Sequence, residues 1–174
     1  MPGVGSDATN LIVLRGNSAS GKSAAAQRIR QRHGRGVAIV GQDAIRRDVL
    51  KERDTPGAAN IALIGLIARY ALDHGRHVII EGILRADHYG DMLATLRADH
   101  RGPSHFFYFD VPYEETVRRH ATKPQASEYG EVEMREWFRP LDLLSTVPEY
   151  RIPESASLDD AVDVIMHRSG LAIG

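Results

Sequence analysis

The sequence of 174 residues contains no cysteine and only three lysines. The absence of cysteine excludes a disulfide framework, a thiolate zinc site and a cysteine nucleophile. It also fits a reducing compartment, and we therefore expect a cytoplasmic protein. Arginine supplies the other 19 of the 22 basic side chains, so a lysine within a recognisable motif is harder to explain by chance.

Long apolar runs are missing as well. The longest, residues 61–68, covers eight residues, whereas a membrane-spanning helix needs roughly 18 or more. The N-terminus has neither the basic region nor the apolar core of a signal peptide. A net charge of −1 argues against the broad positive surface that binds nucleic acid or anionic lipid without specificity. We expect no membrane partner, and contact with nucleic acid only through a local basic patch.

Short apolar runs alternate with helical stretches along the chain. We expect a flexible leader over residues 1–9, followed by one domain over residues 10–174. The expected strands span residues 11–15, 37–41, 78–81, 105–110 and 149–152. The expected helices span residues 22–33, 43–53, 57–74, 87–99, 112–121, 132–138 and 158–167. This alternation predicts a three-layer α/β fold with a parallel sheet, which binds ligands at the carboxyl ends of its strands.

The first expected strand runs directly into the sequence GNSASGKS and then into a helix. This is the G-x-x-x-x-G-K-[S/T] pattern of a phosphate-binding loop, with the flanking elements that the pattern requires. The residues expected to bind the phosphates of ATP are Gly16, Asn17, Ser18, Ala19, Ser20, Gly21, Lys22 and Ser23. Backbone N–H groups and the helix N-terminus attract the anion. We expect Lys22 to act as a catalytic cation on the β and γ oxygens, and the Ser23 hydroxyl to ligate Mg²⁺.

Other motifs distinguish between the classes of protein that carry such a loop. A GTPase needs an N/T-K-x-D motif, and residues 122–125 (TKPQ) lack the aspartate. A large motor ATPase needs a longer chain and an aspartate after an apolar strand, whereas the apolar run at residues 78–80 ends in Glu81. Size and pattern together favour a small kinase.

Acidic residues follow the second and third expected strands, at the same sheet edge as the loop. Asp43 could orient an acceptor hydroxyl and take its proton during phosphoryl transfer, or it could only cap a helix. Arg46 could hold an anionic acceptor or pair with acidic neighbours on its helix. Glu81 could contact the acceptor hydroxyl, hold Mg²⁺ through water, or lie solvated at the strand end.

A third group of charged residues lies in the segment up to residue 139. Arg119 could serve only in an intrahelical ion pair with Glu115. Alternatively, residues 119–139 form a lid that closes over the phosphates and excludes water. Arg119 and Lys123 are four residues apart, so on one helix both would face the same phosphate. The aromatic residues Trp137 and Phe138 are expected in the core.

These motifs resemble those of the small P-loop kinases grouped around zeta toxin, chloramphenicol phosphotransferase and polynucleotide kinase. The resemblance implies a five-stranded parallel sheet in the order 2-3-1-4-5 with a helical lid. It implies that Asp43 is the base for the acceptor hydroxyl and that Arg46 lies on the acceptor side. It further implies that Glu81 and Arg85 belong to an acceptor pocket, because they match an E-G-x-x-R motif of zeta toxin.

The sequence departs from this group at positions around the expected acceptor. Lys123 and Gly82 stand where the polynucleotide kinases have arginine and aspartate, and Ile83 stands where zeta toxin has threonine. The identity of the acceptor is therefore not carried over. We expect an ATP- and Mg²⁺-dependent kinase that phosphorylates a hydroxyl of an antibiotic, nucleoside or sugar derivative. The alternatives are a polynucleotide 5′-hydroxyl kinase and a regulator that binds ATP without turning it over.

Overall fold

Five parallel strands form one sheet in the order β2-β3-β1-β4-β5. The computed structural model describes residues 3–171. The strands are β1 (Leu11–Gly16), β2 (Val37–Gly41), β3 (His77–Gly82), β4 (Ser104–Asp110) and β5 (Tyr150–Pro153). Both the three-layer α/β fold and the strand order implied by the resemblance are confirmed.

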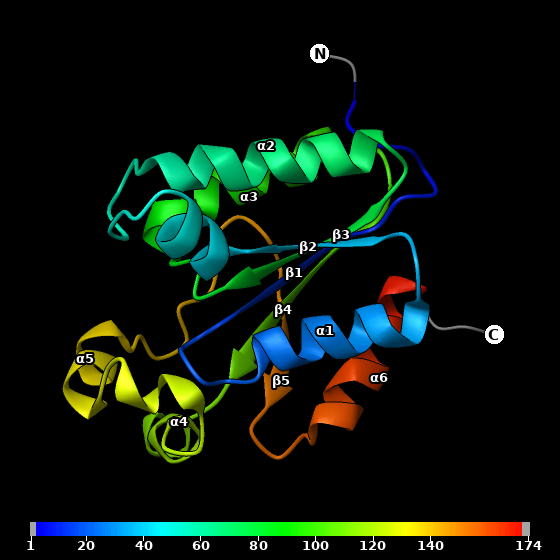
Figure 1. Cartoon of the computed structure of the whole chain (residues 1–174). Helices are drawn as coiled ribbons and strands as arrows, with labels where there is room; N and C mark the ends of the chain where they lie inside the picture. Colours follow the sequence, from blue (N-terminus) through cyan, green and yellow to red (C-terminus); the bar gives the residue numbers. More distant parts are fainter. Residues whose placement is uncertain (1–2, 172–174) are drawn as a thin grey trace.

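Helices cover both faces of the sheet (Figure 1). One face carries α1 (Lys22–His33) and α6 (Leu158–Ser169), and the other carries α2 (Ala59–Asp73) and α3 (Ala86–Asp99). Alternate residues of the central strand serve the two layers: Leu11 and Val13 pack toward α2 and α3, and Leu14 packs toward α1 and α6. Each such fully buried side chain contributes roughly 1.5–3 kcal/mol, which explains why this strand is apolar on both faces.

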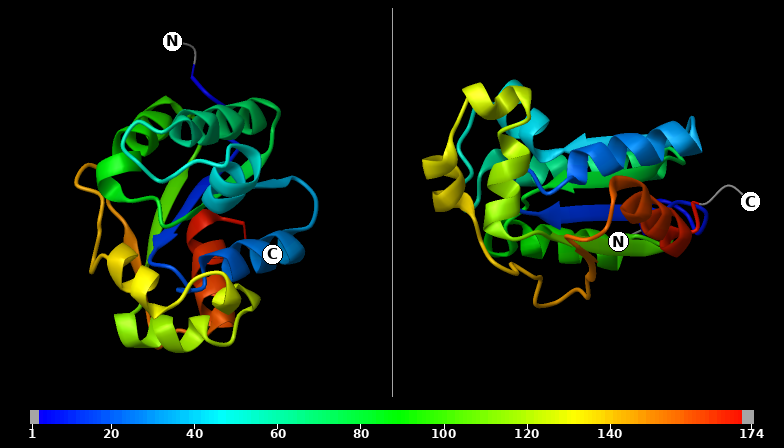
Figure 2. Two further views of the ribbon diagram at one scale, coloured as in Figure 1. Left: turned by 60° about the vertical axis from the view of Figure 1, so that its left-hand side comes forward. Right: turned by 90° about the horizontal axis from the view of Figure 1, so that it is seen from below.

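The short helices α4 (Tyr113–His120), η2 (Pro124–Ser127) and α5 (Glu131–Trp137) lie beyond the carboxyl ends of the strands. Figure 2 shows them, in yellow-green, beyond the arrowhead of β1. The chain then returns to β5 past a buried ion pair. The Nη1 atom of Arg15 donates to both carboxylate oxygens of Glu149 at 2.9 and 2.8 Å, and Nη2 donates to the Asp142 carbonyl at 2.8 Å. Arg15 thereby fixes residues 142–149 to the central strand.

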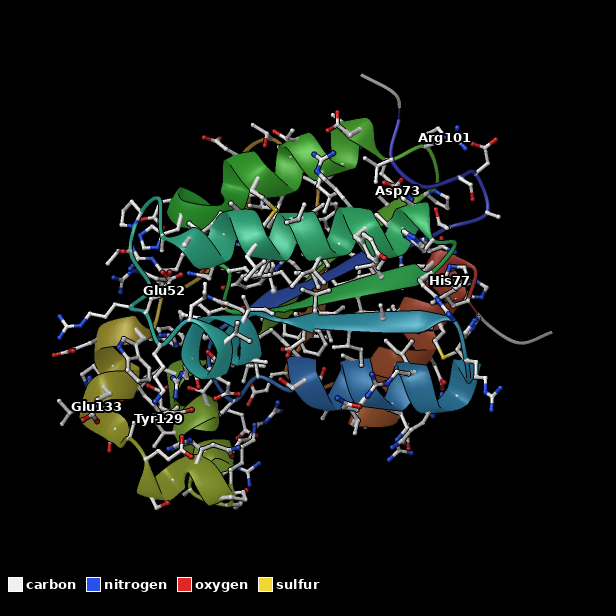
Figure 3. The ribbon with its side chains drawn as sticks, turned by 45° about the horizontal axis from the view of Figure 1, so that its top comes forward. Glu52, Asp73, His77, Arg101, Tyr129 and Glu133 are labelled. Carbon is white, nitrogen blue, oxygen red and sulfur yellow. The ribbon has the colours of Figure 1, made fainter. Side chains whose placement is uncertain are left out.

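The helix expected at residues 43–53 ends earlier than the sequence predicts. Residues 43–53 contain only a short π-helix, η1 (Ala44–Val49), after which Lys51 adopts φ 50°. The chain leaves the helix because the Glu52 carboxylate accepts hydrogen bonds from the backbone and the side chain of Asn60, at the start of α2. This contact turns the segment after η1 into an ordered loop that borders the site. Glu52 is labelled in Figure 3.

The N-terminal segment, expected as a flexible leader, forms hydrogen bonds with the rest of the domain. Val4 is buried, and its N–H donates to the Asp99 carbonyl at 2.8 Å. The Gly5 N–H donates to the Asp73 carboxylate at 2.7 Å, on the side of the molecule where Asp73 and Arg101 are labelled in Figure 3. Residues 1–2 of the leader and 172–174 of the domain lie outside the described residues. No helix within residues 3–171 has the length and apolar character needed to span a membrane.

Candidate active site

The loop between β1 and α1 has the backbone geometry of a phosphate-binding loop. Positive φ angles occur at Gly16 (147°), Ala19 (58°) and Gly21 (104°). A Cβ atom on Gly16 would lie 2.8 Å from the Phe109 carbonyl oxygen, so this position requires glycine. Helix α1 begins at Lys22 with no side-chain cap and no acidic residue in its first turn. Its first N–H groups are thus available to an anion.

Lys22 is buried within this loop. Its Nζ donates to the Asn17 carbonyl at 2.7 Å and to the Ser20 hydroxyl at 3.1 Å. Burial lowers the pKa of Lys22 to about 8, although the nearby charges of Glu81 and Asp43 raise it. Phosphate oxygens would supply the negative charge that stabilises the buried ammonium of Lys22, so the loop fits the phosphates of a nucleotide.

The next loop residue contacts the end of β3. The Ser23 hydroxyl donates to a carboxylate oxygen of Glu81 at 2.8 Å. Burial raises the pKa of Glu81, and the charge of Lys22 opposes that rise. A hydroxyl and a carboxylate are hard oxygen donors of the kind that Mg²⁺ prefers. Within residues 3–171 there is no group of three or more His, Cys, Asp or Glu side chains that could hold a metal ion.

Asp43 lies two residues after β2, and its side chain does not cap the helix η1 that follows. Its side chain is 70% exposed and makes no capping hydrogen bond. It accepts instead from Arg46 Nη2 at 3.1 Å and lies 3.5 Å from Arg47 Nε. The two arginines orient the carboxylate. The alternative that Asp43 serves only as a cap is therefore wrong.

One pocket of about 700 Å³ joins the loop, the ends of β2 and β3, and the segment after α4. The expected site residues that line it are Ser18, Ala19, Lys22, Ser23, Asp43, Arg46, Glu81, Arg85 and Lys123. Sequence analysis missed Arg53, Asp54 and Tyr129, which line it too. Trp137, expected in the core, is another lining residue. Tyr129 closes this pocket over the loop, because its hydroxyl lies 3.1 Å from the Ser18 hydroxyl and its ring contacts Trp137.

Arg119 lies at a different pocket, which has a volume of about 250 Å³. There it donates to the Glu115 carboxylate at 2.7 Å and to the Ser20 carbonyl at 3.3 Å. The expectation that Arg119 and Lys123 share a helical face is wrong, because α4 ends at His120 and Lys123 is extended. The two cations are still close, since the charge of Arg119 adds to burial in lowering the pKa of Lys123.

Apolar side chains line the smaller pocket beside the loop. They come from β4, from β5 and from the start of α6, and they are Phe109, Val111, Ile152, Pro153, Ala156, Leu158 and Ala161. Ser20 and Gly21 join this lining, so the pocket is continuous with the loop. Residues 153–158 contain no binding motif by which this pocket could have been identified from the sequence.

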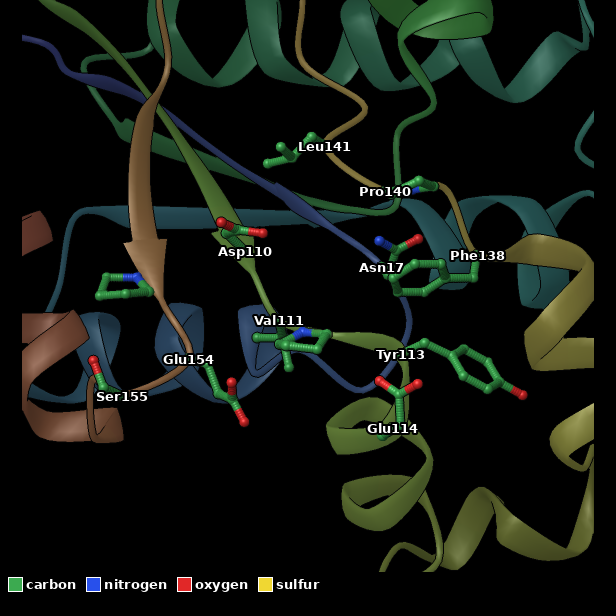
Figure 4. Close-up of a pocket in the computed structure, with 12 residues that line it drawn as sticks. Asn17, Asp110, Val111, Tyr113, Glu114, Phe138, Pro140, Leu141, Glu154 and Ser155 are labelled. Carbon is green, nitrogen blue, oxygen red and sulfur yellow. The ribbon is translucent and has the colours of Figure 1, made fainter.

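Asn17 faces away from both pockets. Its side chain donates to the Arg139 carbonyl and accepts from the Arg139 N–H, both at 2.8 Å. It therefore fastens the segment after α5 to the loop. Asn17 also lines an open groove of about 640 Å³, together with Phe138 and Glu154 (Figure 4).

Comparison with known proteins identifies the family to which the chain belongs. Residues 11–143 match the family described as AAA domain, and the chain belongs to that family. A comparison with curated proteins finds no match.

Solved structures share the fold over nearly the whole chain. APE1195 has a TM-score of 0.70 at 19% identity and covers 97% of this chain and 98% of its own. The Mycobacterium tuberculosis APS kinase CysC, in complex with AMPPNP and APS, has a TM-score of 0.69 at 18% identity and covers 95% and 98%. A gluconokinase from Sinorhizobium meliloti 1021 has a TM-score of 0.61 at 18% identity and covers 95% of each chain. The resemblance to small P-loop kinases is confirmed at the level of the fold.

Proposed function

We propose that this protein is an ATP-dependent kinase that transfers the γ-phosphate to a hydroxyl group of a small molecule. The observation that carries the proposal is the shared pocket. The carboxylate of Asp43 borders the same 700 Å³ space as Lys22 and Ser23 of the phosphate-binding loop. A carboxylate that lies beside a phosphate site can orient the acceptor hydroxyl and take its proton during phosphoryl transfer.

The ATP end of the proposed site combines the loop with the smaller pocket. The N-terminus of α1 and Lys22 would bind the phosphates. The apolar lining beside Ser20 and Gly21 suits the planar base, and Arg119 borders both regions. Arg119 would thus bind ATP from the smaller pocket, and Lys123 from the larger one.

Ser23 and Glu81 are the residues that would hold Mg²⁺. When bound, the ion would neutralise charge on the β- and γ-phosphates. The contact between Ser23 and Glu81 favours this role for Glu81 over direct contact with the acceptor hydroxyl. Glu81 is also close enough for its charge to act on Lys22.

In the proposed reaction, Asp43 takes the proton of the acceptor hydroxyl while the hydroxyl oxygen attacks the γ-phosphorus. The new P–O bond forms as the bond between the γ-phosphorus and the bridging oxygen of ADP breaks. Arg46 and Arg47 hold Asp43 in position for this step. Lys22 stabilises the charge that develops on the transferred group.

The segment over residues 119–139 would act as the lid. Tyr129 reaches from it to Ser18 in the loop, and Lys123 lines the larger pocket from the same segment. A lid that excludes water favours transfer to the acceptor over hydrolysis of ATP.

Replacement of the base tests this proposal. Asp43→Asn should lower kcat about 10²–10⁴-fold, because the amide cannot accept the hydroxyl proton, and should leave the Kd for ATP nearly unchanged. Asp48→Asn is the matched control, since Asp48 is exposed on η1 and does not line the pocket. Unchanged turnover in Asp43→Asn would contradict the assignment of Asp43 as base.

A further inference from the structure

The acceptor side of the larger pocket carries four arginines, Arg46, Arg47, Arg53 and Arg85. Arg46 and Arg47 hold Asp43. Among the described residues, Arg53 and Arg85 form no hydrogen bond or ion pair with Asp43 or the phosphate-binding loop, so the proposed base does not account for them.

Arg53 lies between two anchored acidic residues. Glu52 accepts hydrogen bonds from Asn60, and Asp54 accepts from Gln42 Nε2 at 3.3 Å and lies 3.0 Å from the Nδ1 atom of His88. The side-chain hydrogen bonds of Glu52 and Asp54 therefore fix the position of the backbone on both sides of Arg53. The Arg53 side chain is exposed and has no ion pair or hydrogen bond within residues 3–171. The loop thus presents an uncompensated guanidinium to the pocket.

Arg85 follows a residue with unusual backbone geometry. Leu84 is buried with φ 45°, a backbone conformation that is unfavourable for a bulky residue. Two buried side chains maintain it: the Leu84 N–H donates to Gln42 Oε1 at 2.9 Å, and its carbonyl accepts from Arg15 Nε at 3.0 Å. The next residue, Arg85, then lines the pocket. Its Nε and Nη2 bind Asp87, which leaves Nη1 without a partner among the described residues.

A single side chain connects the two loops. Gln42 binds Leu84 through its Oε1, and through Nε2 it donates to the Tyr89 hydroxyl at 2.8 Å as well as to Asp54. Gln42 and Tyr89 are both buried. The loops that carry Arg53 and Arg85 are thereby fixed relative to each other, as a preorganised binding site requires.

We propose that the phosphate acceptor carries an oxyanion, namely a carboxylate, sulfate or phosphate group, and that Arg53 and Arg85 bind it while the reactive hydroxyl lies at Asp43. Guanidinium groups bind such oxyanions through paired, charge-assisted hydrogen bonds. The oxygens of Asp54 bond to Gln42, His88 and Tyr89, and among the described residues Asp54 forms no ion pair or hydrogen bond with Arg53 or Arg85. The inference rests on the proposed function, since it requires that the loop end of the pocket binds ATP.

The test uses inorganic sulfate as the probe and thermal unfolding of the whole protein as the readout. The protein is first saturated with Mg²⁺ and AMPPNP, so that the phosphate-binding loop is filled. Sulfate is then titrated at constant ionic strength, and the half-saturating concentration is read from the rise in Tm. Arg53→Gln and Arg85→Gln are compared with Arg76→Gln, an exposed arginine in the turn before β3 that does not line the pocket.

We expect saturable stabilisation by sulfate in the wild type and in Arg76→Gln, and a roughly tenfold higher half-saturating concentration in each pocket variant. General salt effects of sulfate cancel in this comparison, because they act equally on all variants. Absence of saturable stabilisation, or equal behaviour of the three variants, would overturn the oxyanion site. Failure of AMPPNP itself to raise the Tm would instead overturn the proposed function.

Discussion

Lys22 is expected to take up a proton when ATP binds. Its pKa is lowered to about 8 in the free protein, chiefly by burial. Bound phosphates would return the pKa toward the ordinary lysine value, because negative charge favours the ammonium form. ATP binding above pH 7 should therefore be coupled to protonation of this one side chain.

The size of the effect follows from the fraction of Lys22 that is neutral before binding. We expect an uptake of about 0.1 proton per ATP at pH 7, about 0.5 at pH 8 and about 0.9 at pH 9. The same linkage weakens the Kd for ATP about tenfold between pH 7 and pH 9. The Kd for ATP rises with pH, because a rising pH removes the ammonium form of Lys22 that binds phosphate.

Isothermal titration calorimetry measures the uptake directly, from the dependence of the binding enthalpy on the ionisation enthalpy of the buffer. Titrations use Mg²⁺ and ATP, whose terminal phosphate is already ionised in this pH range. Lys22→Arg retains a positive charge without titrating, so it should bind ATP with no coupled uptake. Lys51→Arg, on an exposed loop, should behave as the wild type. An uptake that does not rise with pH, or that persists in Lys22→Arg, would refute the reasoning.

Three further substitutions test other contacts. Ser23→Ala should weaken Mg²⁺ binding to the ATP complex about tenfold or more, which is the effect typical of substitutions around metal ligands. A Mg²⁺ titration measures this change. Equal Mg²⁺ affinity in the variant and the wild type would argue against Ser23 as a ligand. Arg15→Met leaves the buried Glu149 carboxylate unpaired, so urea unfolding should report a loss of about 3–5 kcal/mol, and a loss below about 1 kcal/mol would contradict the account. Gly16→Ala should abolish ATP binding, because the new Cβ atom would lie 2.8 Å from the Phe109 carbonyl oxygen. The fluorescence of a nucleotide analogue measures the binding. Normal binding would show that the loop can shift.

Local patterns in the sequence were sufficient to predict the sheet, most helices and the phosphate-binding loop. Gly16 and Lys22 could be recognised because the loop, its strand and its helix are consecutive. Asp43 could be placed near the loop because parallel strands end at one edge of a sheet. These predictions needed no knowledge of contacts between distant segments.

The features that the sequence did not predict depend on such distant contacts. The helix expected at residues 43–53 is interrupted because Glu52 binds Asn60, and the leader is packed because Val4 pairs with His100. The partner of Arg15, Glu149, is 134 residues away in the chain. An arginine in an apolar strand gives no indication of which acidic residue will neutralise it.

The transfer of a labelled γ-phosphate from ATP tests the central claim most directly. The protein is incubated with Mg²⁺, labelled ATP and a panel of antibiotics, nucleosides, sugars and oligonucleotides with free 5′-hydroxyl ends, and the labelled products are separated. We predict that the label moves to a hydroxyl of a small molecule and that Asp43→Asn slows the transfer about 10²–10⁴-fold. Label found only on oligonucleotide ends, or ATP that is bound and not turned over with any acceptor, would contradict the account.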